Sequence, residues 1–177
     1  MNLFRKVAKE TVTTVLLALI LALFIRAYVV EAHVIPSGSM LPTIEQWDRV
    51  LVNKLSYDFG EPERHDIVVF ESPVAVANGG EKQDFIKRVI ALPGERVEIR
   101  EGQVYIDGEP LEEDFILEPP NYNYGPVEVP SNSLFVLGDN RNASYDSHMW
   151  NSWLEVDNVK GQAFIRYWPP ERIGLID

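Results

Sequence analysis

The chain has 177 residues, of which 46% are hydrophobic and 24% charged, and it contains no cysteine. This length and hydrophobic fraction predict one folded domain with an extension and exclude a wholly disordered protein. The missing cysteines exclude disulfide bonds, thiolate zinc sites and thiol catalysis.

Charge is distributed unevenly along the chain. Residues 1–30 carry a net charge of +3, so the total of −11 leaves −14 for the remainder. An acidic protein of this kind repels the phosphate backbone, and we therefore expect no nucleic-acid partner.

The N-terminal segment predicts a membrane anchor. Thr11 to Ile25 contains no charged residue, and continuing to Val30 gives the roughly 20 residues that span a bilayer, with Arg26 near the end able to snorkel to the interface. The cations before Thr11 place the N-terminus in the cytoplasm. We predict a cytoplasmic basic head over 1–10, a single-pass anchor in the lipid bilayer over 11–30, and an extracytoplasmic domain over 31–177.

The same segment has two other interpretations. A buried core helix is disfavoured, because the segment is apolar on every face at the N-terminal end. A cleaved signal peptide shares the basic head and apolar middle, but no small-x-small cleavage site follows directly. The sequence favours an uncleaved anchor.

Short β-type runs separated by turns follow the anchor. Strands are predicted over 49–55, 66–72, 85–92, 96–106 (a hairpin turning at Glu101-Gly102), 133–140 and 163–168. Between them we expect a loop over 73–82, an irregular excursion over 118–130 and a short turn near 148–153. The fold class is therefore mostly β: a compact antiparallel β-sheet domain with one N-terminal transmembrane helix, and with 95–137 as a small hairpin and loop extension.

Several familiar site patterns are absent from the sequence. It lacks H-E-x-x-H, G-x-x-x-x-G-K-[ST], G-x-G-x-x-G and G-x-S-x-G. We expect no metal, nucleotide or other cofactor.

The segment 35–43 is the first candidate for chemistry. Two prolines bracket Ser37-Gly38-Ser39, and the glycine lets the backbone turn tightly and approach another chain. A serine placed there can direct its hydroxyl and its N–H at one incoming carbonyl. An ordinary linker between anchor and domain is the alternative for this segment alone.

The strand 84–92 is the second candidate. Lys87 and Arg88 interrupt an apolar run and point to opposite faces, so at least one of them is expected among apolar side chains. Burial lowers the pKa of a lysine, whereas an arginine cannot be deprotonated. A pKa brought from ~10.4 to ~7–8 would make Lys87 a general base. The alternative is a lysine that reaches solvent at a sheet edge.

The segment 138–148 is dense in polar residues and directly follows an apolar strand. Such a loop can build a hydrogen-bond network behind an active site. A solvated turn is the alternative, and the sequon at Asn142 carries little weight because the match is short.

Together these stretches resemble the type I signal peptidases of bacteria and organelles. The resemblance rests on a basic head, one anchor, P-S-G-S-M-x-P-T, K-R-x-x-x-x-P-G and G-D-N-R-x-x-S-x-D-S, in that order. It implies a membrane-anchored serine endopeptidase that removes signal peptides from exported preproteins after small residues, at Ala-x-Ala-like sites. The D-S-H-x-W spelling looks like cyanobacterial and thylakoid members, so the membrane is the plasma membrane or the thylakoid membrane.

The resemblance also implies roles for individual residues. Ser39 matches the nucleophile, Lys87 the general base, and Ser37 the hydroxyl that forms the oxyanion hole with the Ser39 N–H. Ser144 matches the serine that orients the lysine, and Asp146 matches a supporting carboxylate. Supporting residues that keep the family spelling are Asp139, Asn140 and Arg141. Positions that match the lining of shallow substrate pockets are Ile35, Pro36, Met40, Ile44 and Ile86.

The chain departs from the family pattern at several places. Arg64-His65-Asp66 replaces the usual R-G-D, so the local turn is expected to differ. Ala91 and Glu95 replace a common glycine and aspartate. His148 replaces an arginine, so the pair with Asp146 is expected to be lost or weakened.

Other functions remained open from the residues. A Ser–His–Asp hydrolase using His65 and Asp66 is awkward, because adjacent side chains on a strand point to opposite faces. A self-cleaving repressor would carry a DNA-binding head where the membrane segment lies. The alternative from another class is a non-catalytic, membrane-tethered β-domain that binds exported polypeptides. The oligomeric state cannot be predicted.

Overall fold

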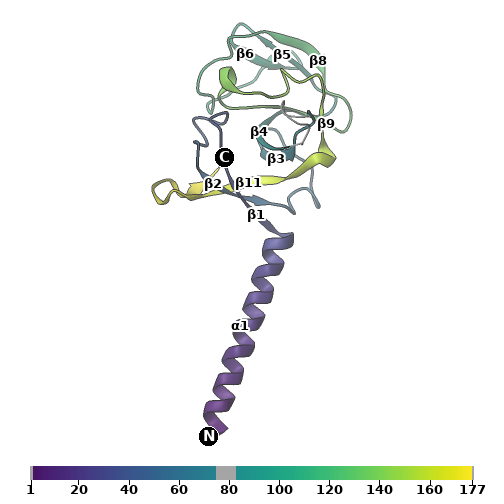
Figure 1. The fold of residues 1–177 in the computed structure, drawn as a ribbon. Coiled ribbons are helices and arrows are strands. Elements are labelled where there is room, and N and C mark those ends of the chain that lie inside the picture. The colour runs from purple at the N-terminus through teal and green to yellow at the C-terminus, as the bar shows by residue number, and fades with distance from the viewer. Residues whose placement is uncertain (1, 75–82, 177) are drawn as a thin grey trace.

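The computed structural model describes residues 2–74 and 83–176. Within these residues there is one α-helix, α1 (Asn2–Tyr28). It is long and apolar enough to cross a membrane, and its apolar stretch is not buried against the rest of the chain. Figure 1 shows the helix projecting away from a body made of strands. The helix begins inside the predicted basic head and ends at Tyr28, before the predicted anchor boundary at 30.

Twelve strands are described after the helix. They are β1 (Val30–Val34), β2 (Arg49–Asn53), β3 (Ile67–Glu71), β4 (Asp84–Ala91), β5 (Arg96–Arg100), β6 (Gln103–Ile106), β7 (Glu109–Pro110), β8 (Tyr124–Glu128), β9 (Ser133–Leu137), β10 (Leu154–Glu155), β11 (Val159–Trp168) and β12 (Gly174–Leu175). Three single-turn 3-10 helices join them, at Arg141–Ala143, Val156–Asn158 and Pro170–Arg172.

The strands form two antiparallel sheets, as the mostly β prediction required. The larger has eight strands in the order β1-β2-β11-β3-β4-β9-β10, with β12 paired to β11. In it β3 and β4 pair so that Val68 faces Lys87 and Ile67 faces Arg88. Strand β4 pairs with β9 on its other side, so the strand that carries Lys87 lies in the interior of the sheet.

The smaller sheet has the order β7-β6-β5-β8. It occupies the end of the body far from α1 in Figure 1. The excursion predicted over 118–130 was wrong in part, because Tyr124–Glu128 forms β8. Pro126 lies within β8 at the edge of the sheet, where a missing N–H does not break a ladder.

The tight turn predicted at Glu101-Gly102 is confirmed. Both residues have positive φ values, 52° and 78°, which suit the right-handed twist of the β5–β6 hairpin. Asp107-Gly108 repeats this geometry, with φ of 53° and 87°, between β6 and β7. Within the predicted 95–137 extension, β5 to β8 form a sheet of their own, whereas β9 at its end belongs to the larger sheet.

Buried apolar side chains form three clusters around the larger sheet. One lies between β2, β4 and the segment after β1 and contains Ile35, Met40 and Ile44. A second joins β4 and β9 to the smaller sheet. Burying each such side chain stabilises the fold by about 1.5–3 kcal/mol relative to exposure, so these clusters hold the segments around Ser39 and Lys87 in place.

Two remaining predictions concern connections. Residues 148–153 form turns without a helix. The loop predicted over 73–82 lies mostly outside the described residues, at 75–82.

Candidate active site

Ser39 lies in the turn that follows β1. The backbone turns at Gly38, whose carbonyl accepts a hydrogen bond from the N–H of Leu41 at 3.3 Å. The carbonyl of Ser39 accepts a hydrogen bond from the N–H of Asn140 at 3.1 Å. The Ser39 side chain is therefore fixed against the polar loop, and the residue is only 7% exposed.

The amine of Lys87 meets the hydroxyl of Ser39. Nζ lies 2.8 Å from Ser39 Oγ, and it donates to the carbonyl of Ile86 at 2.9 Å. Lys87 is 4% exposed, and its amine lies 5.5 Å from the centre of the Phe85 ring. Two residues that are 48 positions apart in the sequence are thus brought within proton-transfer distance in an apolar setting.

Burial sets the electrostatics of this pair. Desolvation lowers the pKa of Lys87 to about 8, against an opposing effect of the carboxylates of Asp146 and Asp139. With that pKa, about a tenth of the amine is neutral at pH 7. A neutral amine can accept a proton from the Ser39 hydroxyl, which is the requirement for a general base.

Ser37 lies beside the pair on the solvent side. Its Oγ is 3.4 Å from Ser39 Oγ, and the residue is exposed. The predicted set of Ser37, Ser39 and Lys87 is therefore brought together. The role of Ser37 in an oxyanion hole remains a prediction.

The polar loop 138–148 packs behind Ser39 and Lys87. The N–H of Gly138 donates to Asp146 Oδ2 at 2.9 Å, and the amide of Asn140 donates to the carbonyl of Gly38 at 3.1 Å. Asp139 accepts two bonds from the guanidinium of Arg88, at 2.9 and 2.8 Å. Asp139, Arg141 and Asp146 are all buried, so the loop is a packed network and not a solvated turn.

Ser144 is also buried at this loop. Its Oγ has no hydrogen-bond partner among the described residues, and those residues show no bond to Lys87. A side chain at Gly138 would collide with this hydroxyl and with the carbonyl of Ser39. Ser144 is thus close to the nucleophile segment, and its role in orienting the lysine remains a prediction.

His148 contacts Asp146 at the position where the arginine pair was expected to be lost or weakened. Its Nδ1 lies 2.6 Å from Asp146 Oδ1. The imidazole also stacks on the ring of Tyr122, with centroids 4.0 Å apart and an angle of 9° between the planes. The imidazole therefore supplies a planar partner for Asp146 where the family has an arginine.

The second departure, at Arg64-His65-Asp66, has a visible consequence. His65 adopts φ of 76°, in the left-handed region that a glycine occupies without strain. Its ring packs edge-on against Phe115, with centroids 5.2 Å apart. The histidine keeps the turn of the glycine and adds a contact to the extension.

The Ser–His–Asp alternative gains no support from this geometry. Asp66 accepts hydrogen bonds from Tyr57 at 2.9 Å and Gln162 at 2.6 Å rather than from His65. Burial and nearby arginines lower the pKa of His65. Among the described residues, no group of three or more His, Cys, Asp or Glu side chains could hold a metal ion.

The predicted pocket residues divide into two kinds. Pro36 is exposed beside Ser37. The other four belong to one core cluster, at 0–7% exposure: Ile35, Met40, Ile44 and Ile86. They form the floor beneath the nucleophile segment, and their contact with a substrate remains a prediction.

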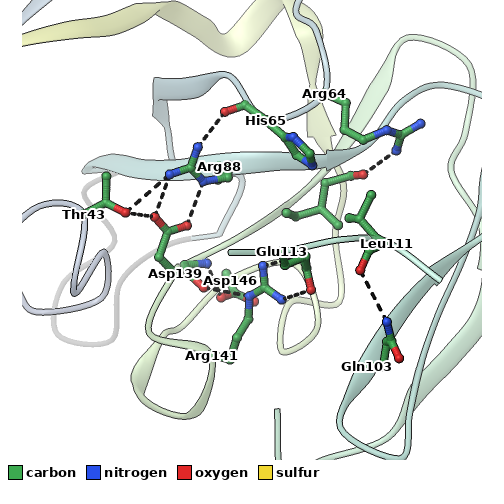
Figure 2. A network of polar contacts seen from close by, with 12 residues as sticks. Thr43, Arg64, His65, Arg88, Gln103, Leu111, Glu113, Asp139, Arg141 and Asp146 are labelled. Carbon is green, nitrogen blue, oxygen red and sulfur yellow. Dashed lines mark hydrogen bonds and ion pairs between the residues drawn. The ribbon is translucent and has the colours of Figure 1, made fainter. Parts of the chain in front are cut away.

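Several residues around the site were missed by the sequence-based prediction. Figure 2 shows Arg88, Thr43 and Glu113 in one network with Asp139 and Arg141. Thr43 donates to Asp139 at 2.6 Å. Arg88 had a readable signal, since a second cation on an apolar strand needs a buried anion. Glu113 had none, because it lies in the extension outside any motif.

Signal peptidases are the known proteins that this chain resembles. A family model described as "Signal peptidase, peptidase S26" matches residues 8–168. A signal peptidase I of Leptolyngbya laminosa is 50% identical over 93% of this chain and 82% of the relative. A probable signal peptidase I-1 of Synechocystis is 51% identical over 95% and 86%.

More distant similarities were also found. Thylakoidal processing peptidase 1 of Arabidopsis thaliana is 40% identical over 97% of this chain and 52% of the relative. A crystal structure of a signal peptidase I from Enterococcus faecalis V583 gives a TM-score of 0.49 at 32% identity, over 58% of this chain and 97% of that chain.

Proposed function

Because this chain belongs to the signal peptidase family, peptidase S26, we propose that it cleaves preproteins by a Ser39–Lys87 dyad. Family membership makes it a membrane-associated serine peptidase that removes signal peptides. The observation that carries the dyad is the 2.8 Å approach of Lys87 Nζ to Ser39 Oγ at a buried position. A non-catalytic binding domain does not require a lysine amine buried beside a serine hydroxyl.

The first half of the reaction acylates Ser39. The neutral amine of Lys87 takes the hydroxyl proton of Ser39 as Oγ bonds to the scissile carbonyl carbon. The developing oxyanion accepts hydrogen bonds from the Ser39 N–H and the Ser37 hydroxyl, each donor being worth about 10²–10³ in rate. The Lys87 ammonium then protonates the leaving amine as the C–N bond breaks.

The second half releases the signal peptide. Lys87 takes a proton from water, and the hydroxide oxygen bonds to the acyl carbon. The Oγ–C bond breaks and the proton returns to Ser39, so the enzyme is regenerated. The buried hydroxyl of Ser144 orients the lysine ammonium between these steps, and Asp139, Arg141 and Asp146 hold the loop that carries it.

The substrates are preproteins with small residues before the scissile bond, at Ala-x-Ala-like sites. The anchor α1 crosses the bilayer once with the N-terminus in the cytoplasm, supported by the cations Arg5, Lys6 and Lys9 at its start. The membrane is the plasma membrane or the thylakoid membrane. Both cyanobacterial and thylakoidal relatives resemble the chain over nearly its whole length.

A preprotein assay tests the proposal. The detergent-solubilised protein is incubated with a preprotein, and the N-terminus of the product is sequenced. We expect a single cut after a small residue, and no product from Ser39→Ala or Lys87→Ala. Product from Lys87→Ala would refute the dyad, and intact substrate with the folded wild-type protein would refute the proposed preprotein substrate.

A further inference from the structure

A strap formed by residues 111–117 connects the smaller sheet to the polar loop. At its start the N–H of Leu111 donates to the carbonyl of Val104 on β6, at 2.9 Å. At its end the N–H of Leu117 donates to the carbonyl of Asp139, at 3.1 Å. The strap therefore bridges the smaller sheet and the polar loop, and the side chain of Asn142 adds hydrogen bonds to the residues that follow the strap, Pro119 and Asn121.

Glu113 is the charged side chain by which the strap holds the loop. Its two carboxylate oxygens accept bonds from the two terminal nitrogens of Arg141, both at 2.7 Å. The side chains of Arg141 and Glu113 are 0% and 5% exposed. A bidentate arginine–carboxylate pair removed from water is strong and directional, so it fixes the position of Arg141.

Arg141 passes this constraint to the nucleophile segment. Its Nε donates to the carbonyl of Gly138 at 3.1 Å, and Figure 2 shows it beside Asp139 and Asp146. The preceding residue in the loop, Asn140, donates hydrogen bonds to the carbonyls of Ser39 and Gly38. Hydrogen bonds at both ends and the backbone of residues 138–141 between them thus connect Glu113 to Ser39.

Two buried ion pairs lie in this network. The guanidinium groups of Arg88 and Arg141 face the carboxylates of Asp139 and Glu113. The ring of Phe115, from the same strap, lies 4.0 Å from the Cζ of Arg88. Removing the Glu113 carboxylate leaves the buried guanidinium of Arg141 as an uncompensated positive charge in the loop that packs behind Ser39 and Lys87.

We propose that Glu113 is a positioning residue for proteolysis, which acts through Arg141 on the loop that orients Ser39 and Lys87. This role rests on the dyad proposed above. It predicts that the loss of the Glu113 charge impairs the chemical step more than substrate binding. It also predicts easier deprotonation of Lys87, because the network around it becomes more positive.

The test compares Glu113→Gln with Glu112→Gln in the full-length, detergent-solubilised protein. Glu112 is the neighbouring carboxylate of the strap and is exposed, so its replacement controls for the loss of one negative charge. For Glu113→Gln we expect kcat to fall by at least about ten-fold with KM changed less than about two-fold, since a displacement of about 1 Å can cost about 10² in rate. The acidic limb of the pH profile should move to lower pH.

A second variant keeps the test decisive if Glu113→Gln does not fold. Glu113→Asp keeps the charge but shortens the reach, so kcat should fall while the pH limb stays at the wild-type position. The proposal is overturned if kcat per folded molecule and the pH limb of Glu113→Gln match those of Glu112→Gln. If Glu113→Gln does not fold, the proposal is overturned when the kcat of Glu113→Asp matches that of Glu112→Gln. Residual cleavage by Ser39→Ala would instead refute the dyad itself.

Discussion

The amine of Lys87 lies on an interior strand, between an apolar ring and the hydroxyl of Ser39. Its neighbour Arg88 is equally buried but is paired with Asp139. The two adjacent cations therefore differ: the charge of Arg88 is stabilised by an ion pair, whereas desolvation disfavours the charged form of Lys87. At the residue scale this difference separates a structural cation from the base that we propose.

The pH dependence of cleavage follows from the lowered pKa of Lys87. The neutral amine is the active form, so kcat/KM should rise about ten-fold per pH unit below pH 8 and level off above it. Initial rates between pH 6 and 9, with a peptide that spans a cleavage site, measure this limb. Lys87→Arg should be inactive throughout, because a guanidinium stays protonated. Activity that is flat across this range would contradict a lysine base.

The imidazole of His148 offers a second prediction at this scale. Asp146 raises the pKa of Lys87, and His148 is the side chain that pairs with its Oδ1. His148→Phe keeps a ring against Tyr122 but removes the nitrogen, so the Asp146 carboxylate acts on the lysine unshielded. The acidic limb should then move to higher pH, by roughly a few tenths of a unit to one unit.

The pH profile of His148→Phe is compared with that of His148→Arg, which restores the family residue. The arginine variant should place the limb at or below the wild-type position. A phenylalanine variant with an unchanged limb would show that His148 is only a packing residue.

At the element scale, the loop 138–148 packs tightly against the segment around Ser39 and against β4. Gly138→Ala would introduce a Cβ into Ser144 Oγ and the Ser39 carbonyl. We expect a loss of activity of more than about 10²-fold and destabilisation of about 1–3 kcal/mol, because the colliding atoms include backbone. Activity and thermal unfolding are measured on the same preparation.

Gly174→Ala is the matched control for that prediction. An added Cβ at Gly174 meets nothing within 4 Å, and this glycine lies on β12. The variant should cleave and unfold as the wild type does. If Gly138→Ala were as active and as stable as Gly174→Ala, the loop would tolerate the added side chain, contrary to this prediction.

The elements also show how far local sequence predicts this fold. The β5–β6 hairpin was predictable because Glu101-Gly102 carries its turn chemistry locally. Strand β8 was not, since its Pro126 and Gly125 argue against a strand and only pairing with β5 stabilises it. Strand β1 was not predicted, and its first residue, Val30, was assigned to the anchor because valine suits a membrane helix and a strand equally.

The candidate site divides in a similar way. Ser39 and Lys87 lie in motifs, so a resemblance identified them, and their 2.8 Å contact agrees with that prediction. Glu113 and Tyr122 come from the extension, where no local pattern marks them. Their partners, Arg141 and His148, are set only by how the smaller sheet packs on the larger one, which is a tertiary property.

For the whole molecule, the boundary between α1 and β1 predicts where the anchor can be removed. A chain that begins at Val29 keeps β1 and the hydrogen bond from the Lys54 N–H to the Val29 carbonyl, at 2.9 Å. It should fold and hydrolyse a soluble peptide, while processing of a membrane-inserted preprotein falls because the enzyme is no longer confined to the bilayer.

A chain that begins at Ile35 provides the contrast. It lacks β1, so β2 becomes an unpaired edge of the sheet. Thermal unfolding should occur at a lower temperature than for the chain that begins at Val29. The interpretation fails if both truncated chains are equally stable, or if the longer one cannot cut a soluble peptide.

Only Val29 separates the last turn of α1 from the first pair of β1, and Ser39 follows five residues after β1 ends. With α1 embedded in lipid, this short, hydrogen-bonded connection would keep the hydroxyl oxygen of Ser39 at a constant height above the bilayer. The distance of a peptide bond from the hydrocarbon edge then becomes a selection criterion in its own right. Two preproteins with identical cleavage motifs at different heights would not be processed alike.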